Sequence, residues 1–264
     1  MRIAAHLHLY YREQWETLLP RIVNLAVCPL DLYVTLPPGG SPDGLLLPGS
    51  PINTHFRVME NRGYDLGPFV ETLNRLELGN YDFLVKLHTK RTVNDWINYR
   101  PLPGGRWRKL LLNFCASRRR VETVINLLER DPMTGMIADR RLIVGQTDTE
   151  ERPEVLAQAR AEIERFGLKP GAAEFVAGTM FIARARLFAP MRGKVRLTDF
   201  APVVAREPAT LAHVYERVLG YLVGAQGLRI TDWRGRGAES GWPVSVRRML
   251  FHALRGAFRA ARGK

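Results

Sequence analysis

Basic and hydroxyl-bearing residues follow an apolar run in "YDFLVKLHTKR", residues 81–91. If the chain stays extended, Lys86, His88 and Lys90 occupy alternate positions and point to one side. Lysine supplies positive charge, while His88 and Thr89 supply hydrogen-bond donors, a combination that suits a diphosphate. The alternative interpretation is an exposed strand end whose charges are solvated.

A second polar segment, "ENRGYDLGPF", precedes a predicted helix. Gly63 permits a tight turn, Arg62 can pair with a phosphate, and Asp65 can accept hydrogen bonds from ribose or sugar hydroxyls. Together with Asn61, these residues form a polar turn at the N-terminus of the predicted helix. A helix N-terminus favours anions. The alternative is a capped turn with Pro68 in the first helical turn.

The apolar segment "FVAGTMFIARARLF" is interrupted by Gly178 and Thr179. A glycine inside a strand pattern marks either close approach by a ligand or a bend in the strand. The two interpretations are equally compatible with the sequence.

A later helical segment, "REPATLAHVYERVLGYL", places His213, Glu216 and Arg217 on one helical face, because their spacing is i, i+3 and i+4. A histidine beside a glutamate can form an acid–base or substrate-orienting pair. A surface helix with salt bridges is the alternative. Glu207 is either a helix-entry residue or a carboxylate that faces the site.

Metal and disulfide chemistry have little support in the sequence. His6 and His8 share one strand face, but the sequence locates no third ligand for zinc. Cys28 and Cys115 are far apart and belong to no Cys-x-x-Cys motif, so neither a disulfide framework nor a zinc site is expected. A reducing, cytoplasmic environment is the default expectation.

These residues must be positioned by a substantial fold. The chain has 264 residues and a hydrophobic content of 46%, enough for one large core. Strand-like and helical patterns alternate from the start, with a strand over 2–11, a helix over 15–26 and a strand over 31–37. This opening predicts an α/β fold with a mixed, mostly parallel sheet flanked by helices.

Charge and hydropathy restrict the partners. The net charge of +13 indicates a polyanion, a phosphate-bearing ligand or an acidic membrane surface. The start of the chain lacks the apolar core of a signal peptide, and no apolar run reaches the roughly 20 residues that span a bilayer. The protein is therefore expected to be soluble or peripheral.

The composition changes after Trp242. Residues 243–264 contain six Arg and Lys residues, no acidic residue and apolar residues at helical spacing. We therefore predict a domain over 1–242 and a basic amphipathic helix over 243–264. The helix either lies on an anionic membrane at the inner face of the plasma membrane or packs on the domain.

The four segments quoted above, in this order and spacing, resemble the bacterial rhamnan synthesis protein F family over roughly Arg2 to Val223. Members resemble glycosyltransferases of polysaccharide and O-antigen assembly, so the resemblance implies a GT-A-like α/β fold. It also implies a nucleotide-sugar donor, dTDP-rhamnose in many members, and a glycan or lipid-linked acceptor.

The resemblance assigns residues to these roles. The donor-binding residues that it implies, with the two lysines of the strand end, are Asn61, Arg62, Gly63, Asp65, Lys86, His88, Thr89, Lys90, Gly178, Thr179 and Arg217. The catalytic candidates are Glu207, His213 and Glu216. The sequence departs from the family at Pro208 and Ala209, where an Asp-Gly pair is expected, and this weakens the assignment of a base near Glu207.

Most GT-A enzymes hold Mn²⁺ or Mg²⁺ with an Asp-x-Asp pair, whereas the comparable strand end here is His-Thr-Lys. We therefore expect cationic side chains to neutralise the leaving diphosphate, with Asp65 or Asp95 the alternative ligands of a Mn²⁺ or Mg²⁺ cofactor. Two rival functions remain, a non-catalytic scaffold and a nucleic-acid-binding module. The second is disfavoured, because six of the positive charges lie in residues 243–264 and no recognition motif is present.

Overall fold

The computed structural model describes residues 1–45, 47, 51–90, 95–97, 100–102, 104–145, 153–203, 210–238 and 249, with side chains for all of these except 95–97, 100–102 and 104–106. Glu207 lies outside these residues. The predicted helix over 243–264 also lies outside them, except for Met249. Within the described ranges, no helix is both long and apolar enough to cross a membrane.

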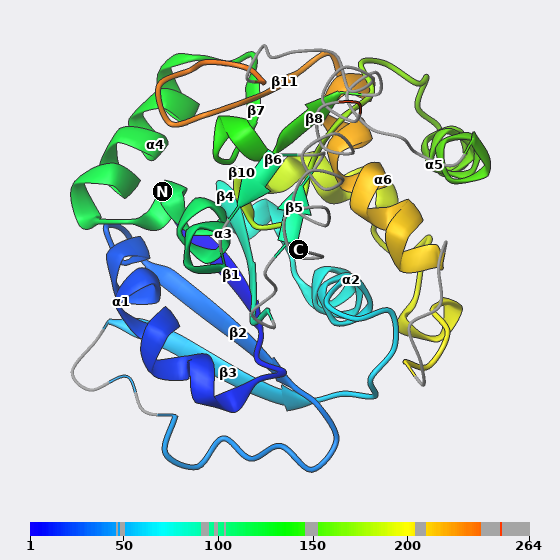
Figure 1. Cartoon of the computed structure of the whole chain (residues 1–264). Helices are drawn as coiled ribbons and strands as arrows, with labels where there is room; N and C mark the ends of the chain where they lie inside the picture. Colours follow the sequence, from blue (N-terminus) through cyan, green and yellow to red (C-terminus); the bar gives the residue numbers. More distant parts are fainter. Residues whose placement is uncertain are drawn as a thin grey trace, which may run out of the picture.

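A mixed sheet forms the centre of the molecule. Its strands are β1 (Ile3–His8), β2 (Leu30–Leu36), β3 (Ile52–Val58), β4 (Phe83–His88), β7 (Thr134–Ile137), β10 (Phe181–Arg184) and β11 (Arg229–Thr231). The seven strands lie in the order β11-β7-β10-β4-β1-β2-β3 (Figure 1). β10 runs antiparallel to both neighbours, and the other pairings are parallel.

Two small sheets lie beside the main one. They pair β5 (Asp95–Ile97) with β6 (Arg100–Leu102), and β8 (Ile143–Gly145) with β9 (Glu174–Val176).

Helices cover both faces of the main sheet. They are α1 (Trp15–Leu25), α2 (Leu66–Arg75), α3 (Gly104–Leu111), α4 (Arg118–Arg130), α5 (Pro153–Arg165) and α6 (Leu211–Ala225). α1 packs against α4, whereas α6 packs against α2 and α5 (Figure 1). The connections β1–α1–β2 and β3–α2–β4 run in opposite directions along the sheet, so right-handed crossovers place α1 and α2 on opposite faces.

The predicted fold class is confirmed: a mostly parallel seven-stranded sheet is flanked by helices, as in a GT-A-like Rossmann fold. The structure differs from the prediction at one strand. The segment 174–184 forms two strands in different sheets, because the turn at Gly178 breaks it. A 3-10 helix, Ala185–Met191, which contains Pro190, follows β10.

The order of the central strands locates a binding crevice. From β1 the chain adds β2 and β3 on one side, and then places β4 on the other side of β1. In open α/β sheets, ligands bind at the carboxyl ends of the strands where the order reverses in this way. β1 and β4 are buried along their whole length, so their apolar residues fix the position of the crevice.

Candidate functional site

A pocket of about 680 Å³ opens at the carboxyl ends of β1 and β4, within the volume range of small-molecule sites. Its lining residues are His8, Tyr10, Tyr11, Asn61, Tyr64, Asp65, Leu66, His88, Thr89, Lys90, Gly178, Thr179, Val203, Ala212, His213 and Glu216. Most of them come from the ends of β1 and β4, the start of α2, the turn after β9 and the first turns of α6. The pocket therefore lies at the point where the strand order reverses.

Strand register groups titratable side chains beneath this pocket. His6 lies opposite Lys86, and His8 lies opposite His88, in the parallel pair β1–β4. Positions two apart on a strand share a face, so these four side chains form a block on one face of the sheet. Phe69 of α2 covers it, with its ring centroid 5.6 Å from that of His6.

Lys86 is fully buried and forms an ion pair with Asp65 at the start of α2. Its Nζ also donates to Thr179 Oγ1 at 2.8 Å, and Thr179 donates to Asp65 Oδ2 at 2.8 Å. Burial alone raises the pKa of the Asp65 carboxyl, but the charges of His88 and Lys86 and the hydrogen bond from Lys86 outweigh it and hold that pKa well below its usual range. The three side chains therefore join β4, α2 and the turn after β9.

Backbone strain is concentrated at the same pocket. Among the described residues, the non-glycine residues with positive φ are Tyr64, at 56°, and Thr179, at 50°. Both line the pocket. A β-branched residue is costly in the left-handed region, and such strain clusters at functional sites.

His88 is held by backbone oxygens on both sides of its ring. Its Nε2 lies 2.8 Å from the Gly178 carbonyl oxygen and 3.8 Å from Asp65 Oδ2, while its Nδ1 lies 3.1 Å from the Thr89 carbonyl oxygen. Burial lowers its pKa to about 4, against the opposing charge of Asp65. A neutral ring donates to one carbonyl only, and the shorter contact favours Gly178.

Thr89 and Gln14 tie the segment after β1 to the end of β4. Thr89 Oγ1 accepts hydrogen bonds from the backbone N–H groups of Tyr10, at 3.0 Å, and Tyr11, at 2.9 Å. Gln14 accepts from the Lys90 N–H at 3.1 Å and donates to the Lys90 carbonyl at 3.0 Å. These bonds fix Lys90 and the two tyrosines at the pocket.

Lys90 supplies the pocket with a cation for which no described carboxylate is an ion-pair partner. Its Nζ lies 5.2 Å from the centroid of the Trp107 ring, within cation–π range. The first N–H groups of α2 are not open to an anion, because Leu66 and Gly67 both donate to the Gly63 carbonyl. An anion in this pocket would therefore depend on side chains, and on Lys90 above all.

Glu216 anchors the turn after β9. Its Oε1 accepts from the Gly178 N–H at 2.8 Å, and its Oε2 pairs with Arg217 Nη1 at 2.7 Å. Arg217 also stacks on the Phe175 ring, with 4.4 Å between Cζ and the centroid. His213 on the same helix lines the pocket, and its Nδ1 lies 2.9 Å from Thr210 Oγ1.

The structure brings most of the sequence-predicted residues to one place. Those that line the pocket are Asn61, Asp65, His88, Thr89, Lys90, Gly178, Thr179, His213 and Glu216. Those outside its lining are Arg62, Gly63, Lys86 and Arg217. Arg62 pairs with Glu60 at 2.6 Å and donates to the Phe200 carbonyl at 3.0 Å, so its guanidinium has other partners.

Sequence reasoning assigned no site role to several residues that line or support the pocket. His8, Tyr10 and Tyr11 belong to the lining, and Gln14 fixes Lys90. The available signal was positional: His8 ends the first strand of a βαβ unit, as His88 ends β4. Open α/β sheets bind ligands at the carboxyl ends of their strands, and this rule covers the end of β1 as well as the end of β4.

The described residues do not fit a divalent cation. No group of three His, Cys, Asp or Glu side chains among them is arranged to hold a metal ion. The carboxylates that line the pocket, Asp65 and Glu216, are each paired with a cation, Lys86 and Arg217 respectively. A divalent ion at Asp65 would lie beside an ammonium group.

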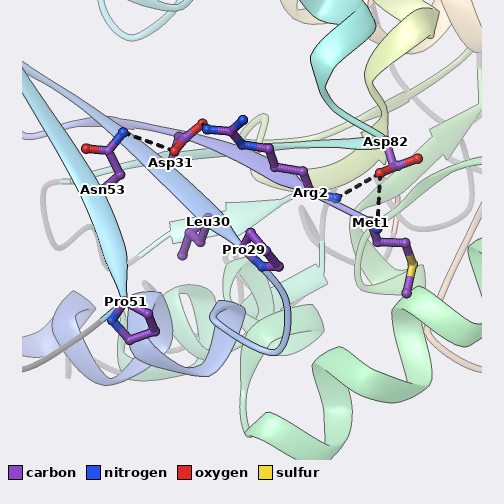
Figure 2. Close-up of a pocket in the computed structure, with 8 residues that line it drawn as sticks. All are labelled: Met1, Arg2, Pro29, Leu30, Asp31, Pro51, Asn53 and Asp82. Carbon is purple, nitrogen blue, oxygen red and sulfur yellow. Dashed lines mark hydrogen bonds and ion pairs between the residues drawn. The ribbon is translucent and has the colours of Figure 1, made fainter.

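A second depression, of about 490 Å³, lies at the opposite ends of the strands, around the amino ends of β1 and β2 (Figure 2). Its polar groups bond to each other: Asp31 pairs with Arg2 at 2.7 Å and accepts from Asn53 at 3.2 Å. The Arg2 N–H donates to Asp82 at 2.8 Å. Because these groups have partners and lie at the wrong end of the strands, the pocket between β1 and β4 is the better candidate.

Comparisons with known proteins find two similar curated sequences. Two proteins named "Uncharacterized protein WxcX", from Xanthomonas campestris pv. campestris strains B100 and ATCC 33913, are 27% identical over 187 residues. The alignment covers 68% of this chain but only 25% of each relative, so the chain spans about a quarter of the length of these curated relatives. No solved structure matches significantly.

A family profile covers much more of the chain. The profile described as "Rhamnan synthesis protein F" matches residues 1–228. This range includes every strand of the central sheet except β11, and all the residues that line the pocket. The chain therefore belongs to the rhamnan synthesis protein F family.

Proposed function

We propose that this protein is a glycosyltransferase of polysaccharide synthesis, which moves a sugar from a nucleoside-diphosphate sugar to an acceptor hydroxyl. The family name supports the pathway class, and the GT-A-like fold supports the reaction class. dTDP-rhamnose is the donor that we propose, with a growing glycan or a lipid-linked glycan as the acceptor.

One observation carries the proposal: the 680 Å³ pocket lies where the strand order reverses and contains Lys90, a cation with no described carboxylate partner. The volume suits a nucleotide sugar, because small-molecule pockets span roughly 300 to 1,000 Å³. The position suits a nucleotide, because doubly wound sheets bind such ligands at this crevice.

The chemistry makes one bond and breaks another. The acceptor oxygen bonds to the anomeric carbon, the bond from that carbon to the diphosphate breaks, and the nucleoside diphosphate leaves with the electron pair. Lys90 is the group that we assign to the growing charge on the leaving oxygens, since a fixed cation in a partly buried site stabilises such charge strongly.

A base must also take the proton of the acceptor hydroxyl. Both carboxylate oxygens of Glu216 already accept bonds, from the Gly178 N–H and from Arg217. This favours His213, whose ring lines the pocket, over Glu216 among the described candidates. Glu207 stays a candidate from the sequence alone.

The test is a turnover assay. The purified chain is incubated with an acceptor glycan and a panel of nucleotide sugars that includes dTDP-rhamnose, and the released nucleoside diphosphate is measured. We expect release with at least one donor and a fall of about 100-fold in Lys90→Ala. Lys169→Ala, an exposed lysine outside the pocket, is the matched control and should be unchanged. Equal release by the two variants would contradict the role of Lys90, and no release with any donor would contradict the activity.

A further inference from the structure

Tyr64 has a backbone conformation that aromatic residues rarely adopt. Its φ is 56°, in the left-handed region, and it follows Gly63, whose φ is 63°. Glycine enters this region without strain, whereas a Cβ makes it costly. Such strain persists only where the surrounding structure enforces it, and it is concentrated at functional sites. The conformation of Tyr64 is therefore a reason to ask what its side chain does.

Contacts on both sides of Tyr64 enforce its conformation. Before it, the Gly63 N–H donates to the Ala201 carbonyl oxygen at 3.2 Å. After it, Asp65 forms an ion pair with the fully buried Lys86. Because both neighbours of Tyr64 are held in place, the direction in which its side chain leaves the backbone is fixed as well.

The ring of Tyr64 lies at the pocket, beside His213. The side chain is partly exposed and lines the pocket. Its ring centroid lies 6.4 Å from that of His213, and the two ring planes are 70° apart, an edge-to-face arrangement. Val203 and Ala212 line the pocket together with Tyr64, and the same three residues line a much smaller hollow. This part of the pocket wall is therefore apolar and lies next to the proposed base.

The proposed reaction determines where the donor sugar lies. Lys90 is assigned to the leaving diphosphate, and His213 is assigned to the hydroxyl that attacks the anomeric carbon. Both residues line the pocket, one after the end of β4 and the other in α6. The anomeric carbon is bonded to the diphosphate and attacked by the hydroxyl, so the sugar must lie beside both residues. A sugar in this place is adjacent to the ring of Tyr64.

We propose that Tyr64 forms the sugar subsite, where its ring packs against the C–H groups of the donor sugar and positions the anomeric carbon near His213. This deepens the proposed function and rests on it. A tyrosine ring suits the task, because it offers a large, rigid apolar surface with a polar tip. The backbone strain at Tyr64 is then part of the site, since it directs the ring toward the bound sugar.

Calorimetric titrations of the full chain with dTDP-rhamnose and with dTDP isolate the contact with the sugar. Tyr64→Asn removes the ring and places there a residue that tolerates the left-handed region, whereas Tyr64→Phe keeps the ring. We expect Tyr64→Asn to weaken dTDP-rhamnose by about 10-fold and to leave the affinity for dTDP as it is in the wild type. Tyr64→Phe should retain most of the affinity for dTDP-rhamnose.

The unfolding midpoint of each variant shows whether it is folded. Tyr64→Gly removes the ring together with the strain, and it replaces Tyr64→Asn in the titrations if the latter does not fold. In a folded variant without the ring, equal weakening of the two ligands, or no weakening of either, would overturn the sugar contact. A loss in Tyr64→Phe as large as that in Tyr64→Asn would assign the contact to the hydroxyl and overturn the packing.

The wild-type titrations separate this inference from the proposed function. If the wild-type chain binds dTDP and dTDP-rhamnose with the same affinity, the sugar subsite is wrong, and the proposed activity is still decided by the turnover assay. If the wild-type chain binds neither ligand, the proposed function fails and the subsite fails with it.

Discussion

Thr179 donates a hydrogen bond to Asp65 Oδ2 at 2.8 Å, across 114 positions of sequence. This bond ties the turn after β9 to the start of α2 and holds Thr179 in the left-handed region, at a φ of 50°. Lys86 completes the arrangement by donating to both side chains. The pocket floor is therefore a buried polar network that connects three elements of the fold.

Breaking this network at Lys86 should destabilise the protein strongly. Lys86→Met leaves the partly buried Asp65 carboxylate beside an apolar group, and loss of one partner of a buried ion pair typically costs about 3 to 5 kcal/mol. Chemical unfolding measures the change. The double variant Lys86→Met with Asp65→Leu should recover part of the loss, and an additive effect of the two changes would contradict the coupling.

Gly178 should not tolerate a side chain. Its φ is +81°, and a Cβ there would lie 2.7 Å from Leu111 Cδ2 and 2.9 Å from Trp107 Cζ2. Gly178→Ala therefore combines backbone strain of about 1 to 2 kcal/mol with overpacking of about 1 to 3 kcal/mol. Gly227→Ala is the matched control, because its φ is +69° and nothing lies within 4 Å of the added Cβ. Equal losses of unfolding free energy in the two variants would rule out the overpacking.

Gln14 should matter for ligand binding more than for stability. Its two hydrogen bonds hold the backbone of Lys90, and the side chain is only partly buried. We expect Gln14→Ala to weaken dTDP binding several-fold and to change the unfolding free energy by about 1 kcal/mol or less. A large loss of stability without a change in affinity would show that Gln14 supports the fold rather than the position of Lys90.

Stability should fall as the pH is lowered from about 6.5 to about 4. Burial lowers the pKa of His8 and of His88 to about 4, and burial also lowers that of His6, whereas free histidine has a pKa of about 6.5. In this window the unfolded chain binds protons that the folded chain does not, so unfolding becomes more favourable as the pH falls. The charged and titratable groups that act on His8 are Asp65, which opposes the shift, and His88 and Lys86, which reinforce it.

Unfolding midpoints between pH 4 and pH 7 measure this effect. His8→Gln and His88→Gln should each lose less stability across the window than the wild type, because each removes one shifted group. His55→Gln, at an exposed position, serves as the control. A wild-type profile that is flat from pH 7 to pH 4 would contradict the burial of neutral imidazoles.

The fold followed from the sequence because periodicity and strand ends are local signals. The apolar run before His88 indicated an extended segment, and this segment forms β4, which is buried along its length. The antiparallel direction of β10 had no such signal, because the alternation of a strand does not specify its partner. The break at Gly178 depends on packing against Trp107 and Leu111, which lie far away in the sequence.

The site was predicted less completely than the fold, for a related reason. Sequence spacing placed Lys86 and His88 on one face but did not show that Asp65 would take up the charge of Lys86. From the sequence, the Thr89 hydroxyl was expected to donate a hydrogen bond to a ligand. In the structure this hydroxyl accepts hydrogen bonds from two backbone N–H groups of the segment after β1. The pairings that set these states form only when distant segments pack together.

A crystal structure of the chain bound to dTDP would show which pocket holds the nucleotide. We predict a diphosphate at the carboxyl ends of β1 and β4, with an oxygen about 3 Å from Lys90 Nζ. A nucleotide seated instead in the depression around Asp31 at the amino ends of the strands, or no bound nucleotide at saturating concentration, would contradict it.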